Sequence, residues 1–480
     1  MVRTGTEVLE RRAPLVAEMA GADLGDQRLN DRRDRLIAAL EQHPDAGFPA
    51  ICADDSDAEA LYRFLRNRRV TLEGILAPHL TATRERCRAL GEVLVIHDTT
   101  EHSFTGDQPR AGLTPLGARR QGFWLHAAVA VSAEGLRAPL GVVAVAPFTR
   151  QPRAVDAPRP SWRERFANPT KESRRWGDGV AAVRTLFGEE IRAIHVMDRE
   201  GDSYELFAAL LARQERFVVR LAYDRRVVPD TTAGDPQTLR AAVPHTDALF
   251  EREVDVTPRR ADPRPRARAR HPARVGRRAT LRFAARRVTL PRPVGVPATL
   301  PAALTLHVVV GWEVAPPAGE VPLEWRLITT EPIETVAHVT HIVEWYRTRW
   351  LIEEFFKCLK TGCAYEKRQL ESLETLLIAL ALLIPIAWQL LLLRHLAREA
   401  HDVPATAALT PRQLAVLRTA PTGARLAARP TIRDALMVVA RLGGHLRQNG
   451  EPGWLVLARG MQKLLIMEAG WAAAQQASTM

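Results

Sequence analysis

Short apolar runs alternate with amphipathic stretches through the middle of this chain, and the alternation predicts a mixed α/β protein. Residues 93–100 and 194–202 begin as β-branched apolar runs of strand length, and each carries an Asp where the apolar run ends. Residues 124–131 and 138–145 flank a Glu-Gly turn and predict a hairpin. Two helices and a strand complete this part of the pattern. They are expected over 177–187, 204–213 and 217–221.

The flanking regions have other patterns. From about 225 to 317, Pro and Arg are frequent and the strand candidates are short, which predicts a β-rich insertion with its Arg residues in a loop or on edge strands. Residues 322–330 return to a strand. Before about residue 70 we expect a small helical module in which Asp23 caps the first of two Arg-bearing helices. After about residue 397 the chain is expected to be helical, with breaks at prolines.

Residues 346–360 contain neither Gly nor Pro, and Gly362 follows them, so they predict a helix with a glycine cap. An advance of about 100° per residue places Glu353 in the middle of one face, among aromatic and cationic side chains. The other members of that face are Tyr346, Arg349, Trp350, Lys357 and Lys360. Two hypotheses fit this pattern: a solvated charged face with ordinary helix pairs, or a metal-binding Glu flanked by side chains that hold a polyanion.

Composition narrows the class of protein. The 480 residues are enough for roughly two to four domains with a substantial core. The content of 46% apolar and 25% charged residues is that of a globular protein and excludes a disordered one. Lys and Arg number 67 against 55 Asp and Glu, and the net charge of +12 favours a polyanionic partner. Twelve Arg and one Asp lie between Arg259 and Arg287, a concentration that suggests a contact surface.

Cysteine usage and hydropathy indicate the compartment. No CxxC pair and no zinc-finger spacing occurs, so we expect incidental thiols in a reduced cytosolic protein. The cysteines are Cys52, Cys87, Cys358 and Cys363. Residues 1–14 lack an apolar core, so no signal peptide is expected. Residues 376–393 are long and apolar enough to span a membrane, but Pro385 and the lack of a second such segment favour a helix buried on all sides.

Three acidic residues form the candidate catalytic set. Asp98 and Asp198 end two predicted buried strands, and Glu353 lies at the centre of the cationic helix. Sites in open α/β sheets gather at strand ends, although a single strand-end Asp is often only a cap or turn residue. Three carboxylates around two divalent ions can catalyse in-line displacement at phosphorus, and Mg²⁺ suits such ligands. His97 and His195 precede the two Asp residues, and strand alternation turns them to the opposite face, where supporting or core roles are expected.

The spacing Tyr346-x2-Arg349-x3-Glu353-x6-Lys360 resembles the signature of the cut-and-paste DDE transposases of bacterial insertion sequences, the family that includes the transposon-five transposase. The segments IHDTTEHSF and VMDREGDSYELF resemble the family's first-Asp and second-Asp strands. Further similar segments, in the expected order, are DLGDQRLNDRR, ALYRFLRN, ERFVVR, PLEWRLITTEPIE and ARLGGHLRQNGEPGW. The resemblance covers nearly the whole chain.

The resemblance implies an α/β fold with a ribonuclease-H-like mixed sheet core, a β-rich insertion, and N-terminal and C-terminal helical domains. It implies a DNA-end-binding domain over 1–70, a catalytic domain over 71–396 with its basic insertion at about 225–317, and a dimerisation domain over 397–480. Asp98, Asp198 and Glu353 would form the catalytic triad. The same three residues would be the ligands of two Mg²⁺ or Mn²⁺ ions.

The resemblance also implies a set of DNA contacts. Tyr346, Arg349 and Lys360 would bind the phosphate of the strand at the transposon end. Trp325 has the position of a ring that stacks on a flipped base during hairpin formation, and Trp350 would support the same DNA end. The remaining DNA-binding candidates are Lys357, Arg220, Arg28, Arg32, Arg63 and Arg66.

The implied function is cut-and-paste transposition: end nicking, hairpin formation and resolution, and strand transfer into target double-stranded DNA. The reaction would run in a homodimer that bridges two ends, in the bacterial cytoplasm with the nucleoid and without a membrane partner. Two alternatives stay open. One is a related metal-dependent nuclease without strand transfer, and the other is a catalytically inactive DNA-binding inhibitor of transposition.

Overall fold

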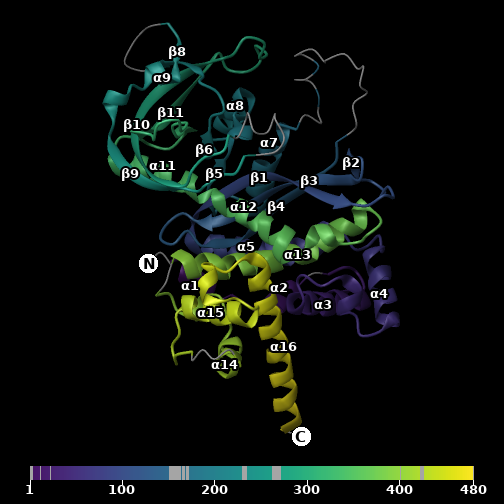
Figure 1. The fold of residues 1–480 in the computed structure, drawn as a ribbon. Helices are drawn as coiled ribbons and strands as arrows, with labels where there is room; N and C mark the ends of the chain where they lie inside the picture. Colours follow the sequence, from purple (N-terminus) through teal and green to yellow (C-terminus); the bar gives the residue numbers. More distant parts are fainter. Residues whose placement is uncertain are drawn as a thin grey trace. The chain divides into compact units, whose positions relative to one another are not determined.

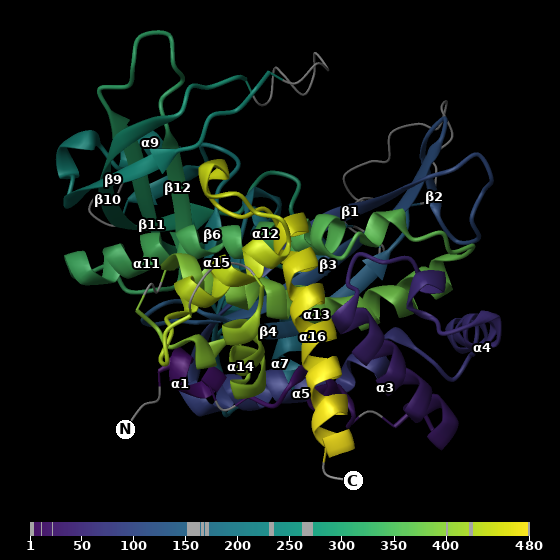
Figure 2. The same ribbon diagram turned by 60° about the horizontal axis from the view of Figure 1, so that its bottom comes forward.

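The structure, a computed structural model, divides into two compact units (Figure 1, Figure 2). The first unit comprises residues 1–158, 178–192 and 350–480, and the second comprises residues 159–177 and 193–349. The residues that the structure describes are 4–10, 12–21, 23–150, 164, 168, 172–229, 235–261, 272–399, 402–421 and 426–478.

An antiparallel sheet lies at the centre of the first unit. Its strands are β1 (Glu92–Thr105), β2 (Thr114–Gly117), β3 (Arg120–Ser132) and β4 (Pro139–Phe148). β3 pairs with each of the other three, which confirms the predicted hairpin. β1 is longer than the strand predicted at 93–100, so Asp98 lies within the strand and the prediction that it ends the strand is wrong. Almost every residue of β3 is buried, as expected of a strand covered on both faces.

Helices of the first unit pack against this sheet. α5 (Leu72–Leu90) and α13 (Leu373–Glu399) lie against β4 (Figure 1), and α12 (Trp350–Lys357) lies against β1. α13 is long and apolar enough to cross a membrane, but 94% of its most apolar stretch is buried inside the protein. Its Trp388 donates a hydrogen bond to the carbonyl of Pro139 at 3.0 Å. This burial agrees with the core helix predicted at 376–393.

The N-terminal module is helical, as predicted, with a different cap. Its helices are α1 (Gly5–Glu10), α2 (Leu15–Met19), α3 (Gln27–Gln42) and α4 (Asp55–Leu65). The prediction that Asp23 caps the first Arg-bearing helix is wrong: Asp26 caps α3 by accepting a hydrogen bond from the backbone of Arg28 at 2.9 Å. Asp23 instead accepts from the backbone of Gly25 at 2.8 Å, because the turn at Gly25 (φ 74°) separates it from the helix.

The C-terminal region is helical and begins its helices near prolines, as predicted. The helices are α14 (Pro411–Thr419), α15 (Ile432–Leu442) and the long α16 (Trp454–Ser478), drawn in yellow in Figure 2. Thr410 and Thr431 cap α14 and α15 with their hydroxyls, and each cap is closed by the side chain three residues on.

The second unit contains a mixed sheet. β5 (Arg192–Met197) and β6 (Arg216–Arg220) are parallel, and the strands that follow in the sheet are antiparallel to their neighbours. These are β12 (Glu324–Thr329), β11 (Ala303–Val314) and β10 (Arg277–Pro291). β7 (Arg226–Pro229) and β9 (Phe250–Val256) both pair with β10, and β8 (Gln237–Thr238) pairs with β7. The helices α8 (Tyr204–Ala212) and α11 (Val336–Thr348) belong to the same unit.

The short strands predicted in the insertion are in fact long. The candidates at 280–283 and 304–310 are parts of β10 and β11, and β10 has pairing partners on both sides. It is therefore neither a loop nor an edge strand. Arg278 and Arg282 are exposed and alternate with the buried Ala279, Leu281 and Phe283 along β10. The density of Arg residues concealed the period-two pattern.

The single helix predicted over 346–360 is interrupted. α11 ends at Thr348, whose hydroxyl donates to the carbonyl of Glu344 at 2.9 Å, a bond that commonly bends helices. Arg349 forms the break, and α12 begins at Trp350. The division between the two units falls at the same break. Tyr346 and Arg349 therefore belong to the second unit, and Glu353, Lys357 and Lys360 to the first.

The predicted glycine cap is also wrong. After α12 the chain forms a π turn, η4 (Cys358–Gly362), and Gly362 lies inside it. The reversal comes at Ala364, which adopts a left-handed conformation (φ 48°) before the short helix η5 (Tyr365–Lys367). The π turn changes the angular position of the residues after Lys357, which a regular helical period does not predict.

Candidate active site and nucleic-acid interface

Asp98 is held on the central antiparallel sheet of the first unit. It lies on β1 opposite Ala127 of β3, is half-buried, and accepts a hydrogen bond from the backbone of Thr99 at 2.7 Å. Its neighbour His97 is wholly buried and stacks on His126 at 5.8 Å. His97 therefore occupies the core face of β1, as predicted from alternation.

The helix α12 carries two adjacent glutamates with different surroundings. Glu354 forms ion pairs with Arg394 (3.3 Å) and Arg398 (3.5 Å) of α13. Glu353 is half-buried and lies about 100° around the helix from Glu354, on the side of Lys357 one turn later. Because α12 packs against β1, Glu353 and Asp98 are carried by neighbouring elements of one unit. Glu354 holds α12 to α13.

In the second unit Asp198 directly follows β5, at the strand end where it was expected. It caps the short turn η2 (Arg199–Gly201) by accepting from the backbone of Glu200 at 2.8 Å, and it is half-buried. Asp202 has a structural role, because it accepts hydrogen bonds from the backbone of Ala222 (2.7 Å) and from Arg225 Nε (2.6 Å). These bonds fix the segment that carries Asp198 to the chain beyond β6.

Three predicted DNA-binding residues of the second unit form one cluster. The ring of Trp325 on β12 meets the ring of Tyr346 on α11 edge-on, with centroids 5.8 Å apart. The guanidinium of Arg220 lies 6.0 Å from the centroid of the Tyr346 ring and donates to the carbonyl of Glu324 at 3.1 Å. Trp325 also contacts Phe283 at 6.2 Å. The arrangement offers one cation and two aromatic rings at the strand ends near Asp198.

Sequence reasoning missed Arg199, the residue after Asp198. Burial and the positive charge of Arg220 lower the pKa of Arg199, and Tyr346 and Asp198 act in the opposite direction. Arg199 thus adds a second cation to the cluster around Tyr346. Its position beside a strand-end Asp was the signal in the sequence that could have found it.

Lys360, in the π turn η4 of the first unit, contacts β1, the strand that carries Asp98. Its Nζ donates to the carbonyl of Glu101 at 2.6 Å and lies 3.6 Å from the carboxylate of Glu366. Lys357 is exposed, and Trp350 is 59% exposed, so both remain accessible to a ligand.

The four Arg candidates of the N-terminal module fall into two pairs. Arg28 and Arg63 are exposed. Arg32 forms an ion pair with Asp57, the third residue of α4. Arg66, which is also exposed, pairs with Glu371 at 2.9 Å. A DNA contact by Arg32 or Arg66 would therefore compete with, or add to, an ion pair within the protein.

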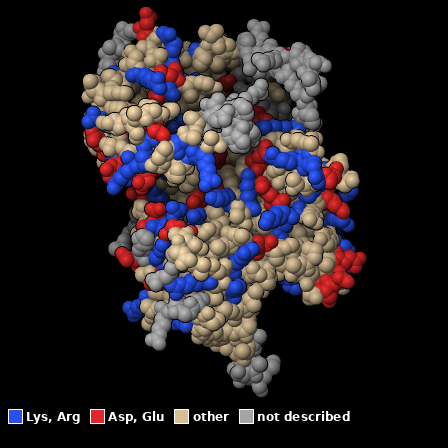
Figure 3. Space-filling view, in the orientation of Figure 1, with Lys and Arg blue, Asp and Glu red and all other residues tan. Residues whose placement is uncertain are grey.

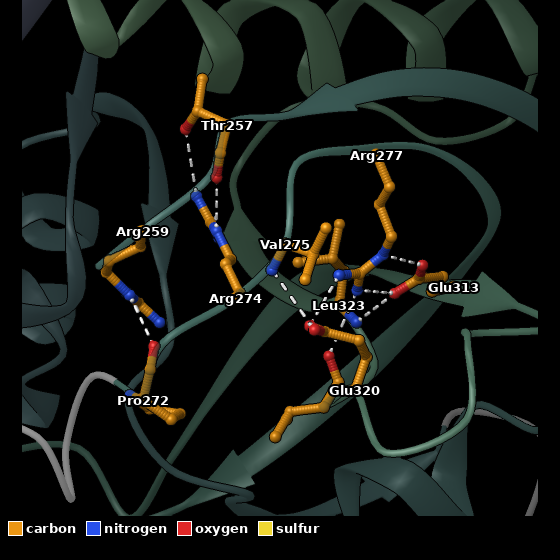
Figure 4. A network of polar contacts seen from close by, with 10 residues as sticks. Thr257, Arg259, Pro272, Arg274, Val275, Arg277, Glu313, Glu320 and Leu323 are labelled. Atoms are coloured by element: carbon orange, nitrogen blue, oxygen red, sulfur yellow. Dashed lines mark hydrogen bonds and ion pairs between the residues drawn. The ribbon is translucent and has the colours of Figure 1, made fainter. Parts of the chain in front are cut away.

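Many of the described arginines of the insertion make internal contacts, some of which are drawn in Figure 4. Arg277 pairs with Glu313 (2.8 Å) and Glu320 (3.0 Å), and Arg274 donates to the carbonyl of Thr257 at 2.9 Å. Further ion pairs join Arg278 to Glu253, Arg282 to Glu251, and Arg286 to Asp247. Basic and acidic side chains are accordingly interleaved on the face shown in Figure 3. Residues 262–271 of the Arg run lie outside the described residues.

Metal binding by the three carboxylates stays a prediction. Within the described parts of the chain, no group of three or more His, Cys, Asp or Glu side chains is gathered closely enough to hold a metal ion. Asp98 and Glu353 belong to the first unit and Asp198 to the second.

Comparisons with known proteins find similarity to transposase domains in two segments of the chain. A transposase DNA-binding family matches residues 12–70, and a transposase DDE-domain family matches residues 177–388, which include Asp198 and Glu353. Among solved structures, the chain is similar to a cryo-EM structure of the piggyBac transposase synaptic complex with hairpin DNA. The identity is 9%, over 82% of this chain and 75% of that chain, with a TM-score of 0.35. The two matched segments are similar to transposase domains and together span more than half of the sequence.

Proposed function

We propose that this protein is a DDE transposase that carries out cut-and-paste transposition of the transposon-five type, on a ribonuclease-H-like core, with Asp98, Asp198 and Glu353 as its triad. The observation that carries the proposal is the DDE-domain match over residues 177–388. The matched segment includes Asp198, at the end of β5, and Glu353, on the helix packed against β1. β1 itself carries the third carboxylate.

The donor set fits divalent metal ions. The three carboxylates are half-buried. The neighbouring Glu354 and Asp202 form ion pairs that hold elements together. Oxygen ligands of this kind suit Mg²⁺ and Mn²⁺. Two such ions, when bound, would lower the pKa of an attacking water and stabilise the leaving oxygen at phosphorus. In the active form we expect the three carboxylates to share them.

The remaining residues bind and orient DNA. Tyr346, Arg220 and Arg199 offer phosphate contacts beside Asp198, and Trp325 offers a ring on which an unpaired base can stack. Arg349, Trp350, Lys357 and Lys360 would extend this contact along the DNA end. Arg28, Arg32, Arg63 and Arg66 would contact the end through the N-terminal module, whose family match is to DNA-binding domains. We further propose a homodimer that bridges two ends in the bacterial cytoplasm.

The test uses purified protein, linear DNA that carries the element's inverted ends, and Mg²⁺. The proposal expects a nick at the end, then a hairpin, then joined products with a target plasmid. Asp98→Ala, Asp198→Ala and Glu353→Gln should abolish all three steps and retain end binding, because removal of a carboxylate leaves the DNA contacts in place. Nicking without joined products would identify a nuclease instead. End binding without any nicking, unchanged by Asp98→Ala, would identify an inhibitor.

A further inference from the structure

The side chain of Lys360 contacts β1 directly. Its Nζ donates to the carbonyl of Glu101, three residues after Asp98, at 2.6 Å. The carboxylate of Glu366 lies 3.6 Å from the same Nζ. The side chains of Lys360 and Glu366 are 29% and 28% exposed, so the amine is held from one side and still reachable from solvent.

Glu366 is itself fixed on both flanks. Its Oε1 accepts a hydrogen bond from the backbone of Ser103 at 3.2 Å and lies 3.5 Å from Nδ1 of His102, which is wholly buried. Burial alone would raise the pKa of Glu366, but the contact with His102 and the charge of Lys360 lower the pKa below its ordinary value. The carboxylate is therefore charged at neutral pH.

The backbone beneath Glu366 is anchored in the core. The ring of Tyr365, the preceding residue, packs edge-on against His102 at 4.9 Å, and its hydroxyl donates to the carbonyl of Leu376 on α13 at 2.8 Å. The left-handed Ala364 turns the chain back after the π turn and so returns Glu366 to β1. The π turn and this reversal together place Glu366 beside the lysine that the turn carries.

A lysine that must meet one phosphate benefits from such a restraint. Its four-carbon stem has a rotamer entropy of about 2 kcal/mol that is lost on binding. A restraint that holds the stem before DNA arrives removes part of that loss. Nζ donates one hydrogen bond, to the carbonyl of Glu101, and forms an ion pair with Glu366, so ammonium protons remain for a phosphate oxygen.

We propose that Glu366 is a positioning residue for Lys360, which it holds along β1 so that the amine meets a backbone phosphate of the DNA end. The proposal rests on the proposed function for the identity of the ligand. The contact between the two side chains belongs to the first unit alone and can be tested without DNA.

The first measurement is the rate of amine acetylation, followed by mass spectrometry in the absence of DNA. Arginine supplies almost all of the positive charge, and the lysines are few: Lys171, Lys357, Lys360, Lys367 and Lys463. In the wild type, Lys360 should react more slowly than the exposed Lys367. Glu366→Gln should raise the Lys360 rate about two- to fivefold, the factor expected for an ion pair of this exposure. Glu366→Asp retains the charge and should recover part of the protection.

The second measurement is the salt dependence of binding to end DNA. Lys360→Ala should lower the slope of log K against log salt by about one, the value for one lost phosphate contact. Glu366→Gln should weaken end binding about two- to fivefold. It should have no further effect in the Lys360→Ala background, because the carboxylate acts only through that amine. Glu190→Gln, which removes an ion pair with Arg88 in the same unit, is the matched control and should leave the slope unchanged.

Two results would overturn the proposal. An unchanged Lys360 rate in Glu366→Gln would show that the carboxylate does not hold the amine. Tighter end binding by Glu366→Gln with the wild-type slope would show that Glu366 only competes with DNA for Lys360. Glu366→Gln could raise the acetylation rate of Lys360 as expected while the wild type neither binds nor nicks end DNA. The proposed function would then be wrong, and so would the DNA contact of Lys360. If the wild type nicks normally and Glu366→Gln changes neither measurement, only the positioning role fails.

Discussion

At the scale of single residues, acidic side chains that lie close together in the sequence have different contacts in the structure. Glu354 pairs with Arg394 and Arg398, whereas Glu353 lies on the side of α12 that carries Lys357. Asp202 binds Arg225 and two backbone amides, whereas Asp198 caps a three-residue turn. The family signature predicts which member of each pair is catalytic. The structure adds a distinct role for the other member.

We therefore expect opposite phenotypes from the two adjacent substitutions on α12. Glu353→Gln should abolish Mg²⁺-dependent nicking, because one of the three proposed metal-binding carboxylates is lost. Glu354→Gln should retain nicking and lose about 1 to 3 kcal/mol, because Arg394 loses its partner in a largely buried site. Nicking assays and urea unfolding measure the two quantities. Similar phenotypes for both variants would contradict the distinction.

A second residue-scale feature is the buried network of Glu18, His79 and Arg86. Glu18 accepts from Nδ1 of His79 and from Arg86, both at 2.7 Å, and the backbone of Val142 donates to Nε2 of His79 at 3.1 Å. Burial would raise the pKa of Glu18, but the hydrogen bond from His79 and the charge of Arg86 lower it to about 2. Burial lowers the pKa of His79, which stays neutral.

Because of both pKa shifts, the folded protein loses stability as the pH falls. The pKa of Glu18 falls from 4.5 in the unfolded chain to about 2, so its contribution is complete above pH 4.5 and is lost as the pH falls toward 2. An unfolded His79 takes up a proton below about pH 6.5, which the buried ring resists, so stability falls there too. Glu18→Gln should cost about 3 kcal/mol at pH 7 and progressively less below pH 4.5. Urea unfolding from pH 3 to 8 measures the difference, and a constant difference would contradict the account.

At the scale of elements, the sequence predicts most strands and helices, and the errors have physical causes. β1, the β3–β4 hairpin and β5 follow from apolar runs and turn residues. β10 was underestimated because its Arg residues look like loop residues until their acidic partners on β9 and β11 are known. The break at Arg349 and the π turn were missed because a regular period cannot register a local change of winding. Glu366 was missed for the same reason.

The packing of α15 on α16 depends on two glycines that periodicity does not identify. A Cβ on Gly460 would lie 1.9 Å from the carbonyl oxygen of Val439, and one on Gly443 would lie 1.9 Å from that of Val456. The two helix backbones therefore approach each other at positions where a side chain does not fit. Gly470, farther along α16, has nothing within 4 Å of its Cβ position.

We expect Gly→Ala to change the free energy of unfolding in opposite directions at two positions of α16. Gly470→Ala should stabilise the protein by about 0.5 to 1 kcal/mol through helix propensity. Gly460→Ala gains the same propensity but must separate α15 from α16, so it should destabilise by about 1 to 3 kcal/mol. Urea unfolding of both variants is the measurement. Stabilisation by Gly460→Ala would show that the close approach of the helices is wrong.

At the scale of the whole molecule, the net charge of +12 does not identify the surface that binds DNA. Arg282 pairs with Glu251 and Arg278 with Glu253, so the described arginines of the insertion strands are offset within their own sheet. Arg63 on α4 is exposed, in the segment matched by a DNA-binding family. Composition alone could not distinguish arginines that are paired within the protein from arginines that are exposed to a ligand.

We expect this difference to appear in the salt dependence of DNA binding. Arg63→Gln should reduce the slope of log K against log salt by about one, because one phosphate contact is lost. Arg282→Gln, the matched control, should leave the slope unchanged, because its guanidinium is paired with Glu251. Fluorescence anisotropy from about 50 to 200 mM salt measures both variants. A reduced slope for Arg282→Gln alone would assign the DNA contact to the insertion instead.

The central claim is that Asp98, Asp198 and Glu353 share divalent ions, and iron-directed protein cleavage tests it most directly. Fe²⁺ in place of Mg²⁺, with ascorbate and peroxide, cuts the backbone next to the bound ion. With the protein on its end DNA, the account predicts cuts near residues 98, 198 and 353 that excess Mg²⁺ suppresses and that Asp198→Ala weakens at all three places. Cuts confined to 98 and 353, or to 198 alone, would contradict a shared metal site.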